Sequence, residues 1–176
     1  MSGPTALHAP AAQAVTQEAF KSAFAQLPTG VTVVTTSTPS GQDSRGMTAS
    51  AVCSLSLDPL MALVCLSNHS RTLAGIQANG AFALNLLRHD QAAIAQRFAD
   101  ARISQDDRFA RTRHHQADAL PVLSDALAWL TCQVADMHPG GDHTIVTAAV
   151  RSIGSGNSPT GGRPLVWHSR AFTTLT

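Results

Sequence analysis

The sequence predicts a single, mainly β domain built from antiparallel strands and about three short helices. Roughly six or seven apolar or β-branched segments are separated by turns, without the regular strand–helix alternation of a parallel sheet. The 176 residues contain no internal repeat and no shift in composition, and this length suits one domain. We expect the domain to span residues 16–176. Residues 1–15, rich in Ala and Pro and without a basic start, are predicted to form a disordered tail rather than a secretory signal.

The composition argues against several classes of function. Charged residues make up 13% of the chain and the formal net charge is +1, which gives no electrostatic footprint for nucleic acid or an anionic membrane. No apolar run approaches the ~20 residues that span a bilayer. Cys53, Cys65 and Cys132 each lie in an apolar strand pattern, which predicts buried, reduced thiols and a cytoplasmic location. The His114–His115 pair lacks further ligands at useful spacing, so no metal site is expected.

The N-terminal part of the domain reads as a helix followed by a hairpin. Thr16 is a helix cap, and Phe20, Phe24 and Leu27 recur at helical spacing, which predicts a stripe facing the core. Pro28 and Gly30 end this helix. The β-branched segment 31–36 is then a strand, and a turn at 39–43 leads to the next strand.

The stretch 47–57 alternates strictly between apolar odd positions and mostly hydroxyl-bearing even positions. This period of two predicts one half-buried strand with an apolar inner face and a polar outer face. After a turn at Asp58-Pro59, residues 60–66 form a continuous apolar run typical of a strand buried on both faces. A helix over 71–79 follows, capped by Ser70 and closed by Gly80.

The segment 67–72 is dense in hydrogen-bond donors and lies at the start of that helix. Hydroxyls and free backbone N–H groups suit the polar edge of a heterocycle, and a helix start beside Arg71 suits a phosphate. The same pattern also fits a solvent-exposed strand face followed by an ordinary capped helix.

The C-terminal half continues with further strands. We expect a strand over 81–87, a helix over 91–99 capped by Asp90 with Ile94 and Phe98 inside, and an exposed loop over 100–120. Further strands are expected at 127–134, 143–153, 164–167 and 171–175, with a turn at 139–142 and a loop at 154–162.

Known catalytic motifs are absent from the sequence. It contains neither a Gly-x-Ser-x-Gly nucleophile elbow nor a P-loop, and the glycines at 154 and 156 do not complete a dinucleotide fingerprint. A bound cofactor is therefore the better source of chemistry. His143 begins a strand after a Gly-Gly-Asp turn, at the rim of the sheet, and spacing alone fits a functional histidine as well as an exposed one beside a turn-stabilising Asp142.

Six motifs occur in the order seen in one family: PTGVTVVTT at 28–36, GMTASAV at 46–52, SLSLDP at 54–59, FALNLL at 82–87, RFA at 97–99 and GGDHTI at 140–145. Over roughly residues 20–175 the chain resembles the short-chain flavin reductases, the reductase components of two-component flavin-dependent monooxygenases. This resemblance implies a split β-barrel of Greek-key topology that binds flavin and forms a homodimer. The chain departs from many relatives at Ala51-Val52, where they carry Ser-Phe, and at Asp58-Pro59-Leu60, where they have a double proline.

The resemblance also implies which residues bind the two nucleotides. His143 is expected to be the catalytic residue over the flavin, and Pro28, Thr29 and Asp142 are expected to join it at the nicotinamide. The flavin is expected to contact four groups of residues: Gly46, Met47, Thr48, Ala49, Ser50 and Ser54; Ser67, His69, Ser70, Arg71 and Thr72; Phe82, Asn85 and Leu86; and Arg97 with Phe98.

The activity implied by the resemblance is NAD(P)H-dependent flavin reduction. Hydride would pass from nicotinamide C4 to flavin N5, and reduced FMN or FAD would reach a partner monooxygenase by diffusion or transient contact. The sequence does not distinguish FMN from FAD as the flavin, or NADH from NADPH as the hydride donor. Two alternatives also stay open: a split-barrel oxidase or oxygenase that retains its flavin, and a non-catalytic flavin-binding module.

Overall fold

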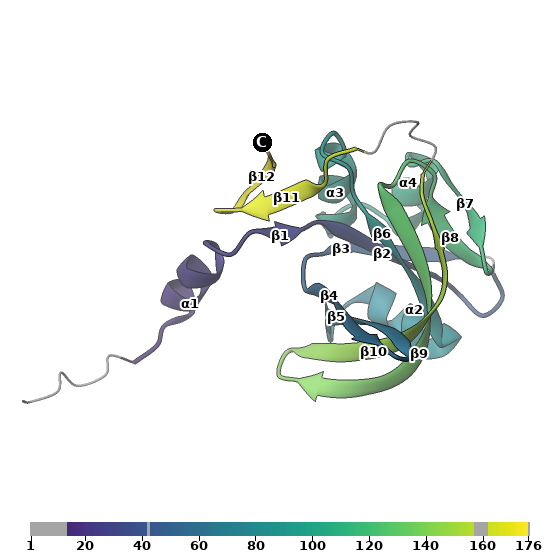
Figure 1. Cartoon of the computed structure of the whole chain (residues 1–176), viewed down its shortest axis with the longest axis horizontal. Helices are drawn as coiled ribbons and strands as arrows, with labels where there is room; N and C mark the ends of the chain where they lie inside the picture. The colour runs from purple at the N-terminus through teal and green to yellow at the C-terminus, as the bar shows by residue number, and fades with distance from the viewer. Residues whose placement is uncertain (1–13, 42, 157–161, 176) are drawn as a thin grey trace, which may run out of the picture.

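The structure is a computed structural model that describes residues 14–41, 43–156 and 162–175. The predicted tail at 1–15 falls almost entirely outside the described residues, as does most of the loop predicted at 154–162. The start of the domain at residue 16 therefore stays a prediction. Figure 1 shows a curved β-sheet with helices against it, and a helical N-terminal arm that stands away from the sheet. No described helix is long and apolar enough to cross a membrane.

Seven antiparallel strands form the central sheet, in the order β3-β2-β6-β9-β10-β5-β4. The edge strands β3 and β4 lie at opposite ends of this order, yet only Ser50 and Ala51 connect them. Because the three Cα–Cα steps from Ala49 to Val52 span at most ~11 Å, the sheet must curl until these two edges come close together. The predicted split barrel is thereby confirmed. The strands are β2 (Thr32–Ser37), β3 (Ser44–Ala49), β4 (Val52–Leu57), β5 (Leu60–Ser67), β6 (Ala81–Leu86), β9 (Ala128–Gly140) and β10 (His143–Gly154).

The prediction of one continuous strand over 47–57 is wrong. The chain pairs with β2 before Ser50 and with β5 after Ala51, so it changes partner at this link. On β4 the even residues Val52 and Ser54 lie opposite the core residues Val64 and Ala62, which reverses the predicted inner face. In the sequence, the alternation of apolar and polar residues continues unbroken through Ser50 and Ala51. In the structure, the change of strand partner turns the chain there, so that odd residues face the core before the link and even residues after it.

A register shift between Ser54 and Ser56 marks a β-bulge on β4. Beyond the bulge, Leu57 lies opposite Leu60 at the end of the barrel, and their exposed fractions are 85% and 53%. The second half of the predicted apolar face therefore meets solvent in the single chain.

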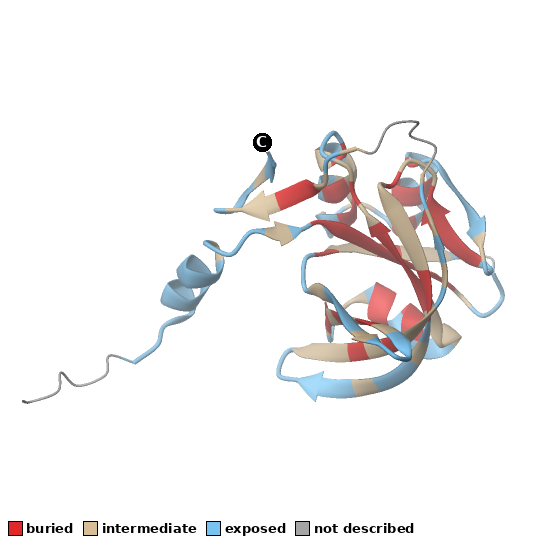
Figure 2. Cartoon of the chain, in the orientation of Figure 1, coloured by how far each residue is buried: buried red, intermediate tan, exposed pale blue. Residues whose placement is uncertain are grey.

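The core fills the barrel interior and is closed at one end by helix α2 (Arg71–Asn79). Leu73 and Ile76 from α2 pack with Val64 and Leu66 of β5, and all four side chains are almost fully buried. The boundaries of α2, its Ser70 cap and the left-handed Gly80 at its end confirm the prediction for this helix. Figure 2 shows the buried residues on the strands and on parts of α2, α3 (Ala92–Ala99) and α4 (Gln105–Ala110).

Helix α1 (Gln17–Phe24) is capped by Thr16 as predicted, but its apolar stripe does not face the core. Phe20, Phe24 and Leu27 are 56%, 58% and 57% exposed. Next to α1 lies a small sheet of β1 (Thr29–Gly30), β11 (Leu165–His168) and β12 (Ala171–Thr174), and together they project from the barrel (Figure 1). Helical periodicity predicts an apolar face but does not identify what covers it.

The segment 100–120 is not an exposed loop. It contains α4 (Gln105–Ala110), capped by Ser104, and β7 (His114–Ala117), which pairs with β8 (Leu120–Leu123). The turn of this hairpin uses Asp118 and Ala119 at positive φ, without the glycine that would have signalled it. Four described α-helices result, where about three were expected.

Two further boundaries differ from prediction. Helix α3 (Ala92–Ala99) has Gln91 at its N-cap position, because the predicted cap Asp90 instead pairs with Arg88. Strand β9 continues through Pro139, which lies opposite Thr144 of β10. Pro139 is tolerated because that part of β9 pairs only with β10 and needs no second donor.

Candidate functional site

A polar cavity of about 450 Å³, the polar cleft, lies between β3, the start of α2 and the α3–α4 segment. It brings together eight of the residues predicted to bind flavin: Met47, Thr48, Ser67, His69, Ser70, Arg71, Thr72 and Phe98. The other lining residues are Ala99, Ala101, Ile103, Gln105 and Arg108. Two arginines and no carboxylate line the cleft, so it is suited to an anion.

The N-terminus of α2 lies at this cleft and is capped by Ser70. The Ser70 hydroxyl accepts hydrogen bonds from the N–H groups of Thr72 (3.1 Å) and Leu73 (3.2 Å), and donates to Met47 Sδ (2.9 Å). The Thr72 hydroxyl is buried and has no hydrogen-bond partner among the described residues. A helix start that carries an unpaired hydroxyl and is flanked by Arg71 is a favourable place for a phosphate group.

A second cavity of about 630 Å³, the α1 groove, separates α1 from the outer face of β4 and β5. Leu63 and Cys65 line this groove, and Ser67, the next residue on the same face of β5, lines the polar cleft. The two cavities therefore adjoin along one strand face. Ser50 and Ala51 at the β3–β4 link, Thr29 of β1 and Trp167 of β11 also line the groove.

His143 lies beside the junction of the two cavities. It is paired across strands with Ser67, so both side chains leave the sheet on the same face. Asn68 fixes the turn before His143 by donating from its backbone to the Asp142 carbonyl (3.0 Å) and from Nδ2 to the Gly141 carbonyl (3.1 Å). The His143 side chain is 45% exposed and lines neither cavity in the described structure.

The carboxylate of Asp142 contacts His143 Nδ1 at 2.7 Å. This hydrogen bond, reinforced by the charge of the imidazole, holds the pKa of Asp142 below its ordinary value. Neighbouring residues of one strand point to opposite faces, but Asp142 reaches His143 because Asp142 belongs to the turn and only His143 to the strand. Asp142 thus fixes which nitrogen of His143 faces away, leaving Nε2 directed outward.

Several residues predicted to contact flavin make contacts within the protein. Phe82 is fully buried in the core. The buried Asn85 side chain donates to Val33 O and Thr35 Oγ1 and accepts from Leu123 N. Arg97 donates to the Arg111 carbonyl and the Thr112 hydroxyl. Phe82 and Asn85 are therefore buried and engaged within the protein, and Arg97 is partly engaged, while contact of these three residues with flavin stays a prediction.

The backbone of Gly46 is also occupied: its N–H donates to Gln105 Oε1 (2.8 Å) and its carbonyl accepts from Arg108 Nη1 (2.7 Å). A side chain here would collide with Phe98, 2.7 Å from an added Cβ, so this glycine serves close packing. Ala49 is buried on the inner side of the barrel, and Pro28 is exposed and lines neither the cleft nor the groove.

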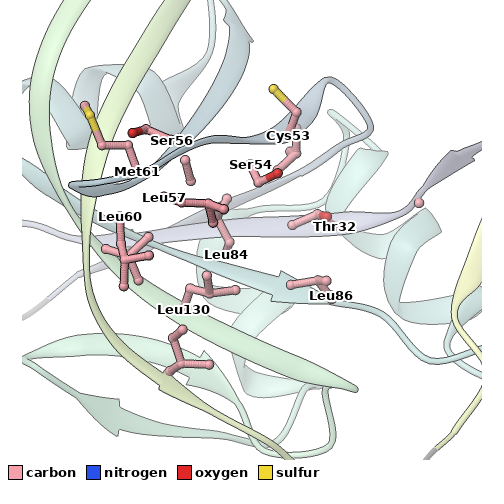
Figure 3. Close-up of a pocket in the computed structure, with 15 residues that line it drawn as sticks. Thr32, Cys53, Ser54, Ser56, Leu57, Leu60, Met61, Leu84, Leu86 and Leu130 are labelled. Carbon is pink, nitrogen blue, oxygen red and sulfur yellow. The ribbon is translucent and has the colours of Figure 1, made fainter.

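The remaining predicted contacts, Ser54 and Leu86, line a third cavity. This apolar cavity of about 380 Å³ opens at the end of the barrel away from α2, and Leu57, Leu60, Leu84 and Leu130 surround it (Figure 3). It shares no lining residue with the polar cleft. Its leucine walls offer few partners to a charged or hydrogen-bonding ligand.

Residues missed by sequence reasoning are Gln105 and Arg108, which line the polar cleft from α4. Ser104 followed by Asp106 and Asp107 is a helix-start signal that would have revealed α4. Cys53 is exposed, Cys65 is partly buried and Cys132 is buried, so the expectation of three buried thiols holds only for Cys132. Burial raises the pKa of the Cys132 thiol to about 12. Within the described part of the chain no three His, Cys, Asp or Glu side chains gather as a metal site.

Known proteins are similar to this chain in sequence and in fold. The chain is 40% identical over 158 residues to a flavin reductase (NADH) of Kitasatospora aureofaciens, covering 88% of this chain and 80% of that protein. It is 36% identical to the reductase component of 4-hydroxyphenylacetate 3-monooxygenase of Thermus thermophilus, covering 90% of this chain and 97% of that one. The structure of the NADH:FAD oxidoreductase SgcE6 of Streptomyces globisporus superposes with a TM-score of 0.82 at 27% identity, covering 99% of both chains.

The family described as "Flavin reductase like domain" matches residues 24–176, from the end of α1 to the last residue. That span includes the barrel, the polar cleft and the His143 turn. The chain belongs to the flavin reductase-like family.

Proposed function

We propose that the protein is an NADH-dependent flavin reductase that supplies reduced flavin to a partner monooxygenase. The observation that carries this proposal is the junction of an anion-binding cleft and an open groove on one face of β5. A flavin mononucleotide has the same division, with a phosphate at one end and a flat ring at the other. Membership of the flavin reductase-like family supports the proposal, as do relatives named as NADH-dependent flavin reductases.

The residues of the cleft fit the phosphate end. The α2 N-terminus, Arg71 and the unpaired hydroxyl of Thr72 would receive the phosphate. The β3–β4 link, with Ser50 at its start, and Cys65 would lie against the ring. A bound flavin supplies the ring nitrogen that accepts hydride, and the protein's part is to align the two rings and exclude water between them.

The groove is wide enough to admit a second ring from solvent, as a reductase that releases its product requires. Its α1 side carries Phe24, and its floor carries Thr29 and Trp167. We assign the part of the groove beside Phe24, Thr29 and Trp167 to the nicotinamide, and the part beside the β3–β4 link and Cys65 to the flavin ring. The Thr29 hydroxyl is buried and has no partner among the described groups, so it can hydrogen-bond a carboxamide. His143, at the junction, would hydrogen-bond the nicotinamide through Nε2 and orient it without exchanging a proton.

A homodimer is part of the proposal. Leu57, Leu60 and Ile153 surround the mouth of the apolar cavity and are 53–85% exposed. The stripe on α1 is exposed to a similar degree. Apolar surface on this scale is uncommon on a monomer and typical of an obligate interface. Reduced thiols and the use of NADH fit a cytoplasmic enzyme.

Steady-state oxidation of NADH, with and without added FMN, FAD or riboflavin, tests the proposal. We expect turnover only when free flavin is present, since a reductase of this kind uses flavin as a substrate. Tightly bound stoichiometric flavin without NADH turnover would instead favour a flavin-retaining oxidase or a binding module. NADPH in place of NADH identifies the preferred donor.

A further inference from the structure

Arg108 of α4 is a buried cation whose charge has no carboxylate partner in the described structure. The residue is 6% exposed. Its Nη1 donates to the Gly46 carbonyl and its Nη2 to the Asp100 carbonyl, both at 2.7 Å. The Asp100 carboxylate is engaged elsewhere, in a two-pronged pair with Arg102 at 2.7 and 2.9 Å. Two carbonyl groups are therefore the hydrogen-bond partners of a guanidinium that burial has removed from water, and the Asp100 charge acts on it without a direct ion pair.

The hydrogen-bonding capacity of Arg108 is also incomplete. Its Nε is buried and has no partner among the described atoms. Burial lowers the pKa of Arg108, the charge of Asp100 opposes this, and the like charge of Arg71 lowers the pKa further. A fold that buries an arginine this way keeps a positive charge that an incoming anion can neutralise.

The location of Arg108 indicates where that anion binds. Arg108 and Arg71 line the same cleft, Arg108 from its buried side and Arg71 from its exposed side. The buried and unpaired hydroxyl of Thr72 lies in the same cleft, on the first turn of α2. Two independent features of the cleft, the buried charge of Arg108 and the buried Thr72 hydroxyl, thus lack a partner among the described residues, and the positive end of the capped helix α2 lies beside them.

We propose that Arg108 is a positioning residue for the 5′-phosphate of the flavin, acting through buried charge and through the two backbone segments that it ties together. The inference rests on the proposed function. The hydrogen bonds from Arg108 to the carbonyls of Gly46 on β3 and Asp100 after α3 hold the two walls of the cleft in place. The charge of Arg108 attracts the phosphate from the buried side of the cleft. Arg71 completes the site from solvent. The phosphate-bearing flavins are therefore preferred over riboflavin chiefly through Arg108.

Fluorescence titration of FMN and riboflavin against wild type and R108Q tests this. R108Q is expected to weaken FMN about ten- to a hundredfold, the range for a lost interaction with a charged group, and riboflavin by less than about threefold. R102Q is the matched control, because Arg102 lies close in sequence but is 90% exposed and lines no part of the cleft. Both affinities of R102Q should stay within about twofold of wild type.

R71A keeps the inference testable if R108Q fails to fold. With Arg108 intact, R71A should retain at least about a fivefold preference for FMN over riboflavin, and the preference should persist in high salt because a buried charge is weakly screened. Complete loss of the preference in R71A would overturn the inference. Equal weakening of FMN and riboflavin in R108Q would overturn it too, since Arg108 would then act only as a brace.

Failure of the inference and failure of the proposed function give different results. If wild type oxidises NADH with riboflavin as readily as with FMN and binds both equally, the phosphate site is wrong and the reductase stands. If no flavin supports NADH oxidation, the proposed function itself fails.

Discussion

The polar cleft and the apolar cavity lie at different ends of the barrel and are opposite in chemistry. The cleft gathers two arginines, four hydroxyl residues and a helix N-terminus, whereas the cavity is walled mainly by apolar side chains, five of them leucines. The cleft leaves charge and donors unsatisfied, and the cavity leaves apolar surface uncovered. Unsatisfied polar groups favour the binding of a small charged ligand, and exposed apolar surface favours contact with another protein chain. We therefore assign the cleft to flavin and the mouth of the cavity to a second copy of the chain.

The largest expected effect comes from placing a charge at the cavity mouth. Leu57→Asp should raise the dimer dissociation constant more than about 100-fold, because burying an unpaired carboxylate costs several kcal/mol. Sedimentation of wild type should show a dimer at micromolar concentration, and the variant should show a monomer. Gln116→Asp on the exposed strand β7 is the control. A stable wild-type monomer would contradict the assignment of the cavity mouth as a dimer interface.

Asn85→Ala tests whether Asn85 stabilises the core or contributes to flavin binding. Because Asn85 satisfies three buried groups, its loss should lower the free energy of unfolding by about 3 kcal/mol, within the cost of leaving buried groups unpaired. Denaturant unfolding measures this change. Flavin affinity of the folded variant should stay within about twofold. A selective loss of flavin binding would restore Asn85 to the site that its motif predicted.

His143→Ala tests the junction between cleft and groove. We expect kcat/KM for NADH to fall about five- to 150-fold, corresponding to roughly 1–3 kcal/mol of lost positioning, with flavin affinity little changed. Steady-state kinetics and flavin titration together provide the measurement. Loss of flavin with hydride transfer intact would move His143 to the flavin side of the site. No change in either constant would leave it as the exposed neighbour of a turn-stabilising Asp142.

Arg71→Ala should give a smaller and more selective change. FMN affinity should fall up to about tenfold and riboflavin affinity should be unaffected, because Arg71 is exposed and its interaction with phosphate is screened by solvent. Repeating the titration in high salt should shrink the difference between wild type and variant. Equal losses for the two flavins would mean that Arg71 supports the structure rather than the phosphate.

The sequence predicted elements whose ends are marked by neighbouring residues, but not features that depend on residues far apart in the chain. The α2 helix was predictable because Ser70 and Gly80 mark its two ends, and the eight residues gathered in the cleft lie on that helix or on motif segments near it. The change of strand partner at Ser50–Ala51 was not predictable, since alternation runs through it unbroken. The burial of Arg108 depends on carbonyls 8 and 62 residues away along the chain, which no local pattern records. The stripe on α1 was predictable from its periodicity, but its exposure was not, because periodicity does not tell what an apolar face packs against.

Hydrogen–deuterium exchange with and without FMN tests most directly which cavity receives the flavin. The account predicts slower exchange on FMN binding across residues 67–73, at the start of α2, and across 105–109 of α4, with 55–61 at the mouth of the apolar cavity unchanged. Slowed exchange confined to 55–61, with the start of α2 unaffected, would contradict it and place the flavin in the apolar cavity.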